Sequence, residues 1–128
     1  ISKDFDKKGI SLIVENLFPS LKKRHSLNCS IEEIRELMNQ APKTVGFLLD
    51  LGHLNVSSVI LDFDRNNALD KLLKEFGNRL LEVHISENNG LKDEHLAVKK
   101  KSWQLDALHQ IKEATRNNKK EVIKYKWN

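Results

Sequence analysis

In residues 45–53, VGFLLDLGH, a short apolar run is followed at once by an acid, a glycine and a histidine. Apolar runs that do not alternate with polar residues are typical of strands buried on both faces, as in parallel sheets. Gly52 permits a tight turn after such a strand. The stretch therefore predicts a parallel strand from Val45 to Leu49, with Asp50 and His53 just past its carboxyl end.

Three similar strands are predicted on either side of this one. An apolar run at residues 11–14 leads directly to Glu15, and a run at residues 79–83 leads directly to His84. The last strand is expected over residues 121–127. Each of the four segments is short and is bounded by polar or turn residues, so each is interpreted as a strand of one sheet.

Three helices are predicted between these strands. Ser30 and Glu33 have the spacing of a capping box, which favours a helix from there to Gln40. Two more helices are expected, over residues 68–76 and from a cap at Ser102 onward. Strands that alternate with helices in this way indicate an α/β fold built of parallel β/α units.

Composition places the chain among globular proteins of one domain. It has 128 residues, of which 39% are apolar, and it contains no apolar run long enough for a transmembrane helix. Cys29 is the only cysteine, which suits a reducing compartment. We therefore expect a soluble, cytoplasmic protein without a membrane partner.

The positive charge of the chain is spread over short segments. The net charge is +4, and three lysine-rich runs occur without an adjacent aromatic platform: residues 22–24, 99–101 and 119–120. Carboxylates are interspersed along most of the chain, so these runs are interpreted as solvated faces. A nucleic-acid partner is possible on this charge but is the less favoured interpretation.

Three successive strands are expected to end in a residue that can bind a metal ion: Glu15, Asp50 and His84. Since the carboxyl ends of parallel strands meet at one edge of a sheet, these side chains should lie together. Taken singly, each acid could simply cap a helix and each histidine could be structural. Together they favour a site for zinc, manganese, magnesium or cobalt.

A second set of polar residues lies slightly beyond these strand ends. His53 follows Asp50 by three residues, and Asp93 and His95 are separated by one residue in the loop after His84. All three side chains could project over the same mouth. They are predicted to hold a second metal ion or to bind substrate.

At these positions the sequence resembles the xylose-isomerase-like TIM-barrel superfamily, which includes sugar isomerases, sugar epimerases and zinc-dependent apurinic-site endonucleases. The matching segments are Glu15-Asn16, residues 50–53, residues 83–90 and residues 93–96. The resemblance implies that Glu15, Asp50 and His84 coordinate a divalent metal. It also implies that a glutamate of the last strand completes the set. This sequence has Lys124 and Lys126 there, and Glu121 comes earlier.

The resemblance leads to a functional hypothesis with two alternatives. The first is a divalent-metal-dependent isomerase or epimerase of a sugar or sugar phosphate, with Glu15 as the base that removes the proton alpha to a carbonyl. One alternative is a zinc-dependent phosphodiesterase of the apurinic-endonuclease type. The other is a degenerate, non-catalytic member of the fold, because the lysines of the last strand would repel a metal ion.

The length of the chain suits half of such a barrel. A closed barrel takes eight strands and typically about 250 residues, whereas four strands are predicted here. The chain is therefore expected to be one domain, residues 1–128, corresponding to the C-terminal half of the barrel. Two open sheet edges favour self-association or, alternatively, an N-terminal half that precedes Ile1 in a longer protein.

Overall fold

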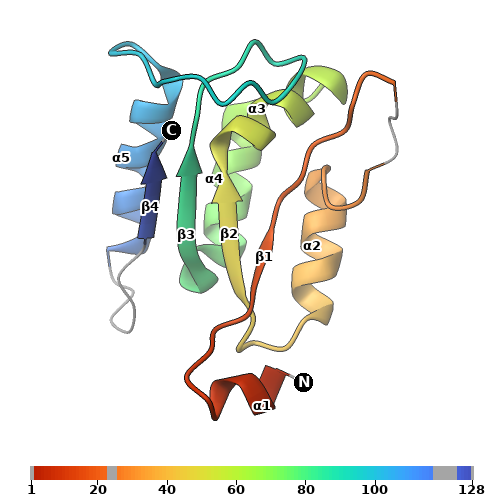
Figure 1. Ribbon diagram of the computed structural model, residues 1–128, viewed down its shortest axis with the longest axis vertical. Helices are drawn as coiled ribbons and strands as arrows, with labels where there is room; N and C mark the ends of the chain where they lie inside the picture. Colours follow the sequence, from red (N-terminus) through yellow and green to blue (C-terminus); the bar gives the residue numbers. More distant parts are fainter. Residues whose placement is uncertain (1, 23–25, 117–123, 128) are drawn as a thin grey trace.

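A four-stranded parallel sheet forms the centre of the computed structural model, which describes residues 2–22, 26–116 and 124–127. The strands follow each other in the sheet in the same order as in the sequence (Figure 1). Their bounds are β1 (Ile13–Glu15), β2 (Gly46–Asp50), β3 (Leu80–Ile85) and β4 (Lys124–Trp127). Their carboxyl ends therefore lie at one edge of the sheet, as the sequence predicts.

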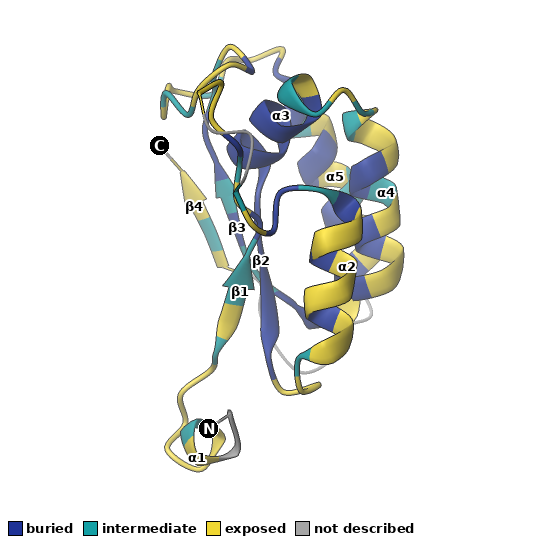
Figure 2. Ribbon diagram, turned by 90° about the vertical axis from the view of Figure 1, so that its right-hand side faces the viewer, coloured by how far each residue is buried: buried dark blue, intermediate teal, exposed yellow. Residues whose placement is uncertain are grey.

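The long helices all lie on one face of the sheet. Figure 2 shows α2, α3, α4 and α5 on the same side of the strands, with the short α1 apart from them at one end. The bounds are α1 (Ser2–Asp6), α2 (Ile31–Gln40), α3 (Leu51–Ile60), α4 (Arg65–Phe76), the 3₁₀ helix η1 (Gly77–Arg79) and α5 (Trp103–Thr115). This arrangement confirms the predicted parallel β/α units.

The hydrophobic core fills the space between the sheet and these helices. Phe47 and Leu49 of β2 are buried beneath the helices, and the Phe47 ring meets the Phe76 ring of α4 edge-on at a centroid distance of 6.4 Å. Leu69 and Ile111 contribute fully buried side chains from α4 and α5. In a β/α barrel, a core of this kind lies between the strands and the outer ring of helices.

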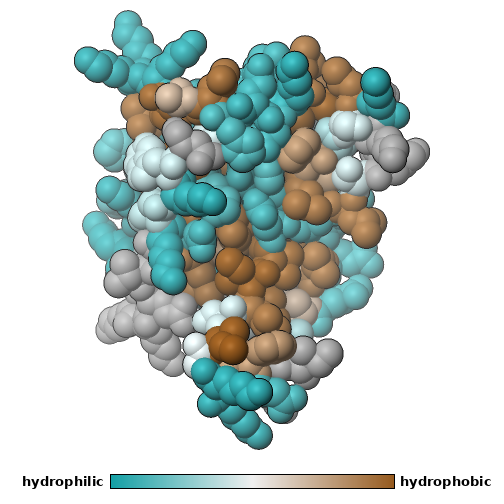
Figure 3. Space-filling view, viewed as in Figure 1, coloured by the Kyte–Doolittle hydropathy of each residue, from teal (hydrophilic) through white to brown (hydrophobic). Residues whose placement is uncertain are grey.

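The other face of the sheet carries no helix in the described residues. Figure 3 shows hydrophobic side chains exposed on this side of the molecule. Within the described part of the chain, the outer strands β1 and β4 each pair with one neighbour, and Ile13 of β1 is exposed. In a closed barrel this face would point inward, so the sheet has the form of half a barrel.

The capping box predicted at the start of α2 is present. The Ser30 hydroxyl accepts from the backbone N–H of Glu33, and the Glu33 carboxylate accepts from the backbone N–H of Ser30. Helix α4 begins at Arg65, earlier than the expected residue 68, because the Asp64 carboxylate accepts from the N–H of Asn67 and caps a preceding turn. The cap predicted at Ser102 is also present, because its hydroxyl accepts from the backbone N–H of Gln104, and α5 ends at Thr115.

The tight turn predicted after Asp50 is wrong, because α3 begins directly at Leu51. Asp50 is the N-cap of this helix, and its Oδ1 accepts from the backbone N–H of His53 at 2.8 Å. Gly52 instead permits a close approach to β3, since a Cβ there would lie 2.6 Å from Ser86 Oγ. Helix α3 shows no helical periodicity because most of it is buried.

Helix α4 ends at Phe76, the end predicted for it, and Gly77 is its C-cap. Gly77 is right-handed, with φ −57° and ψ −31°, and it opens η1. Arg79, expected as the first residue of a strand, closes η1, and β3 starts at Leu80. None of the helices in the described part of the chain has the length and apolarity to cross a membrane.

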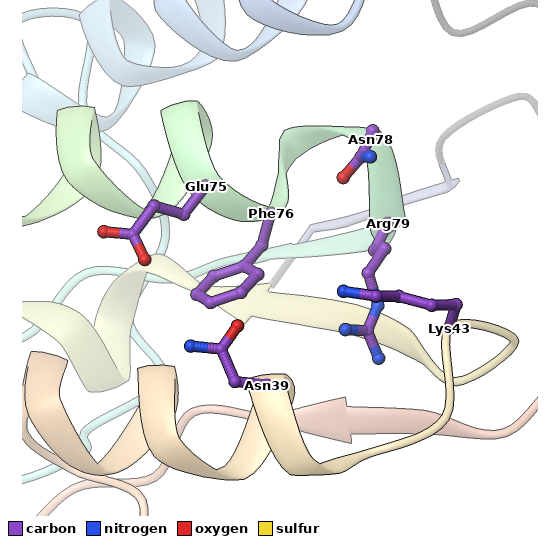
Figure 4. A pocket seen from close by; sticks show the side chains of 6 residues that line it. All are labelled: Asn39, Lys43, Glu75, Phe76, Asn78 and Arg79. Atoms are coloured by element: carbon purple, nitrogen blue, oxygen red, sulfur yellow. The ribbon is translucent and has the colours of Figure 1, made fainter.

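A polar pocket of about 430 Å³ lies at the amino ends of the strands, opposite the predicted site (Figure 4). Its lining includes Asn39 of α2, Lys43 and Glu75. Arg79 also lines it, but its guanidinium donates to backbone carbonyls of the segment that joins α2 to β2. Since these carbonyls occupy the guanidinium donors, Arg79 supports this end of the fold.

Candidate metal centre

The ends of β1, β2 and β3 bring Glu15, Asp50 and His84 together. His84 Nδ1 lies 3.4 Å from Asp50 Oδ2 and 3.7 Å from Glu15 Oε1. Asp50 and His84 are register partners on neighbouring strands, so their side chains project on the same face. The three residues predicted as metal ligands are thus neighbours in space.

His53 lies in the same group, although the sequence placed it in a second set. It comes from the first turn of α3, which starts at the end of β2. Its Nδ1 lies 3.4 Å from Glu15 Oε1 and its Nε2 lies 3.8 Å from Asp50 Oδ2. Glu15, Asp50 and His53 each offer one ligand atom within 4.8 Å of the others.

Asp93 and His95 extend this cluster outward. Asp93 Oδ2 lies 3.3 Å from His53 Nε2 and 2.6 Å from His95 Nε2. The Asp93 side chain is only 9% exposed, and its Oδ1 is buried without a hydrogen-bond partner among the described residues. His95 is half-exposed and has a positive φ of 52°, a strained conformation that is enriched at functional sites.

The hydrogen bonds of the buried His53 and the partly buried His84 indicate which ring nitrogens face the carboxylates. The backbone carbonyl of Asn16 lies 2.9 Å from His53 Nδ1 and can only accept, so Nδ1 carries the proton and Nε2 faces Asp50 and Asp93. Glu82 lies 2.9 Å from His84 Nε2 and accepts from it, so His84 Nδ1 faces Asp50 and Glu15. In a neutral ring each of these inner nitrogens carries a lone pair, which a facing carboxylate repels unless that nitrogen is protonated or a cation lies between. The donor set therefore fits a divalent metal ion.

Asn16 holds the Asp50 backbone in place. The Asn16 side chain accepts from the Asp50 N–H at 2.8 Å and donates to the Asp50 carbonyl at 3.0 Å. With its backbone carbonyl on His53, this one buried residue contacts two members of the cluster. The sequence singled out Asn16 only as the neighbour of Glu15.

A buried polar network anchors the loop that carries Asp93 and His95. Asn88 donates to the Gly52 carbonyl at 2.9 Å and accepts from Asn55 at 2.8 Å, which ties the loop to α3. Arg65 donates to Asn55 at 2.6 Å and stacks on the ring of Trp103 at 3.8 Å. Burial lowers the pKa of Arg65. The loop is thus fixed to α3, and Arg65 of α4 holds Asn55 of α3 from behind.

Glu82 is a site residue that the sequence interpretation missed. It precedes His84 by two residues on β3, so the alternation of a strand places both side chains on the same face. A carboxylate that accepts from the far nitrogen of a ligating histidine orients the ring and raises its basicity. The period of two along the strand is the signal that could have identified it.

Substitution of Glu82 by glutamine should weaken divalent-metal binding by about tenfold or more, the usual range for partners of ligating histidines. The amide oxygen of the new side chain can still accept from His84 Nε2, so the ring keeps its orientation and loses only the neighbouring carboxylate charge. Titration calorimetry with Mn²⁺ measures this effect. Glu32→Gln, on the exposed side of α2, is the matched control and should bind Mn²⁺ like the wild type.

The last strand has lysines on the face that carries the cluster. Lys126 is the register partner of His84, and Lys124 is the register partner of Glu82. Both lysines are exposed. Residues 121–123, including Glu121, lie outside the described residues. Within the described strand, the position expected for a fourth carboxylate ligand is therefore occupied by lysine.

Comparison with known proteins identifies a structural relative. No protein-family model matches the chain, and no curated protein matches it. A solved crystal structure of a D-tagatose 3-epimerase-like protein matches with a TM-score of 0.69 and 25% sequence identity. The match covers 100% of this chain and 45% of that protein. This chain is accordingly related in structure to part of a xylose-isomerase-like TIM barrel.

Proposed function

We propose that this protein is a divalent-metal-dependent isomerase or epimerase of a sugar or sugar phosphate. The observation that carries the proposal is the set of acidic oxygens and free imidazole nitrogens of Glu15, Asp50, His53 and His84 at the strand ends. The structural relation to an epimerase-like protein supports the same chemistry. Manganese, zinc, magnesium and cobalt all suit these ligands.

Within this site, Glu15 is the proposed base. Its side chain is 33% exposed, whereas that of Asp50 is 2% exposed and is held by the His53 N–H. Glu15 can therefore reach a substrate carbon above the mouth and accept the proton alpha to the carbonyl. A bound metal ion would act as a Lewis acid on the carbonyl oxygen. Asp50 and His84 are proposed as metal ligands. His53, Asp93 and His95 would hold substrate hydroxyls in this reaction, or a second ion in the phosphodiesterase considered below.

Exchange of substrate hydrogen with solvent deuterium tests the proposed reaction. In D₂O with Mn²⁺, the protein should introduce deuterium at the carbon alpha to the ketose carbonyl, as followed by proton NMR. Glu15→Gln should abolish the exchange, while Glu36→Gln on the exposed side of α2 should leave it unchanged. Equal exchange by both variants would show that Glu15 is not the base.

A zinc-dependent phosphodiesterase of the apurinic-endonuclease type is the second candidate. The chain of contacts from His53 through Asp93 to His95, with the unpartnered Asp93 Oδ1, favours a second metal ion. Two or three zinc ions can activate a water molecule and stabilise the charge on a phosphodiester in the transition state. The number of bound ions separates the candidates, since the epimerase needs one per site.

Lys124 and Lys126 support a third candidate, a non-catalytic binding member of the fold. The two ammonium groups lie on the face of the sheet that carries the cluster. They would repel a metal cation bound there. Failure of both manganese and zinc to bind would favour this candidate over the two enzymes. Binding of either manganese or zinc would argue against this candidate.

We further propose that other strands complete the barrel. The chain spans less than half the length of its structural relative, and β1 and β4 leave both sheet edges open. A second copy of the chain would supply four more strands, and an N-terminal half of a longer protein is the alternative. Sedimentation at micromolar concentration should show two chains per particle, whereas a well-behaved monomer would contradict self-association.

A further inference from the structure

A groove of about 470 Å³ lies beside the metal centre. Residues 18–22, which follow β1, form one wall, and Asn89, Leu91 and Lys92, which follow β3, form the other. This volume is in the usual range for small-molecule sites, about 300–1,000 Å³. Loops after the strands of a β/α barrel commonly bind substrate. The groove is therefore placed to hold part of a ligand.

Phe18 lies between the groove and the metal centre. The Phe18 ring lines the groove and lies 4.7 Å from the His53 ring, tilted by 46°. His53 in turn contacts Glu15 and Asp93 of the cluster. A ligand that reacts at Glu15 and extends past Phe18 therefore enters the groove with its far end.

The chemistry of the groove favours an anionic group. Leu21 and Leu91 are exposed apolar side chains on opposite walls, and Lys22 and Lys92 are the charged residues that line it. Among the described residues, no carboxylate forms an ion pair with either lysine. Both lysines are exposed, and ammonium groups next to apolar side chains attract an acid.

We propose that this groove is a subsite for an acidic group, phosphate or carboxylate, at the end of a ketose remote from its carbonyl. Lys22 and Lys92 bind the acid, and Phe18 and the two leucines contact the apolar face of the sugar chain. The preferred substrate is then an acidic ketose. This inference rests on the proposed function, since the reacting end of the sugar is placed at Glu15.

The test compares three sugars of equal chain length in calorimetric titrations of the protein with Mn²⁺: a ketohexose, its 6-phosphate and a ketohexuronate. At least one acidic sugar should bind about tenfold or more tightly than the neutral one, as expected for charge-assisted hydrogen bonds. The tighter of the two acids identifies the phosphate or the carboxylate. The variant Lys22→Gln/Lys92→Gln should lose this preference.

The matched control is Lys71→Gln/Lys112→Gln, which removes the same charge from exposed positions on α4 and α5. This control should keep the preference. Equal affinity for acidic and neutral sugars, or a preference that survives loss of Lys22 and Lys92, overturns the inference. A lysine-dependent preference without deuterium exchange keeps the groove and rejects the proposed reaction. Exchange without such a preference rejects the groove alone.

Discussion

Substitution of Asp50 by asparagine is expected to reduce divalent-metal affinity by about 100-fold or more, since even outer partners of metal ligands contribute 10–100-fold. Asp50 Oδ2 faces both His84 Nδ1 and His53 Nε2. Asparagine replaces that charge with a neutral amide. Its Oδ1 can still accept from the His53 N–H, so the cap of α3 is kept.

The measurement is the rise in melting temperature on addition of Mn²⁺, because an ion that binds only the folded state stabilises it. The wild type should show this rise and the Asp50→Asn variant should not. Asp106→Asn, at an exposed position in the first turn of α5, should respond like the wild type. An undiminished rise in the Asp50→Asn variant would mean that this carboxylate binds no metal.

Replacement of Arg79 by methionine is expected to lower the free energy of unfolding by about 3–4 kcal/mol, because each buried acceptor left unpaired costs about 1–3 kcal/mol. The Arg79 guanidinium donates to the carbonyls of Met38 at 2.6 Å, Val45 at 2.9 Å and Pro42 at 2.9 Å. These bonds join α2 to the start of β2. Burial also lowers the pKa of Arg79.

Urea unfolding with EDTA present measures this loss without a contribution from bound metal. Arg35→Met is the control, because Arg35 forms a single surface ion pair with Glu75 at 2.8 Å. That pair should contribute less than about 1 kcal/mol. Similar unfolding free energies for the two variants would contradict the role given to Arg79.

The sequence predicted the parts of the fold that have a regular pattern. The apolar run before Asp50 and the capping box at Ser30 identified β2 and α2 because each pattern follows from local geometry. Helix α3 escaped prediction because it is buried nearly all round, so its apolar residues show no period. The need for glycine at position 52 arises from Ser86, which is distant in sequence.

The part of the site that lies at the strand ends was predictable from the sequence. Glu15, Asp50 and His84 converge because their strands are parallel neighbours. The position of His53 depends on α3 starting without a turn, so its closeness to Glu15 could not be inferred from spacing. The hydrogen bond between Glu82 and His84 could not be predicted from the sequence, because it depends on the orientation of the imidazole ring.

The number of metal ions bound per chain tests the central proposal most directly. Equilibrium dialysis against Mn²⁺ and against Zn²⁺, followed by elemental analysis, gives this number. One divalent ion per chain is expected, and it should be lost in the Asp50→Asn variant. Binding of neither metal would contradict it, and two or three zinc ions per chain would favour the phosphodiesterase instead.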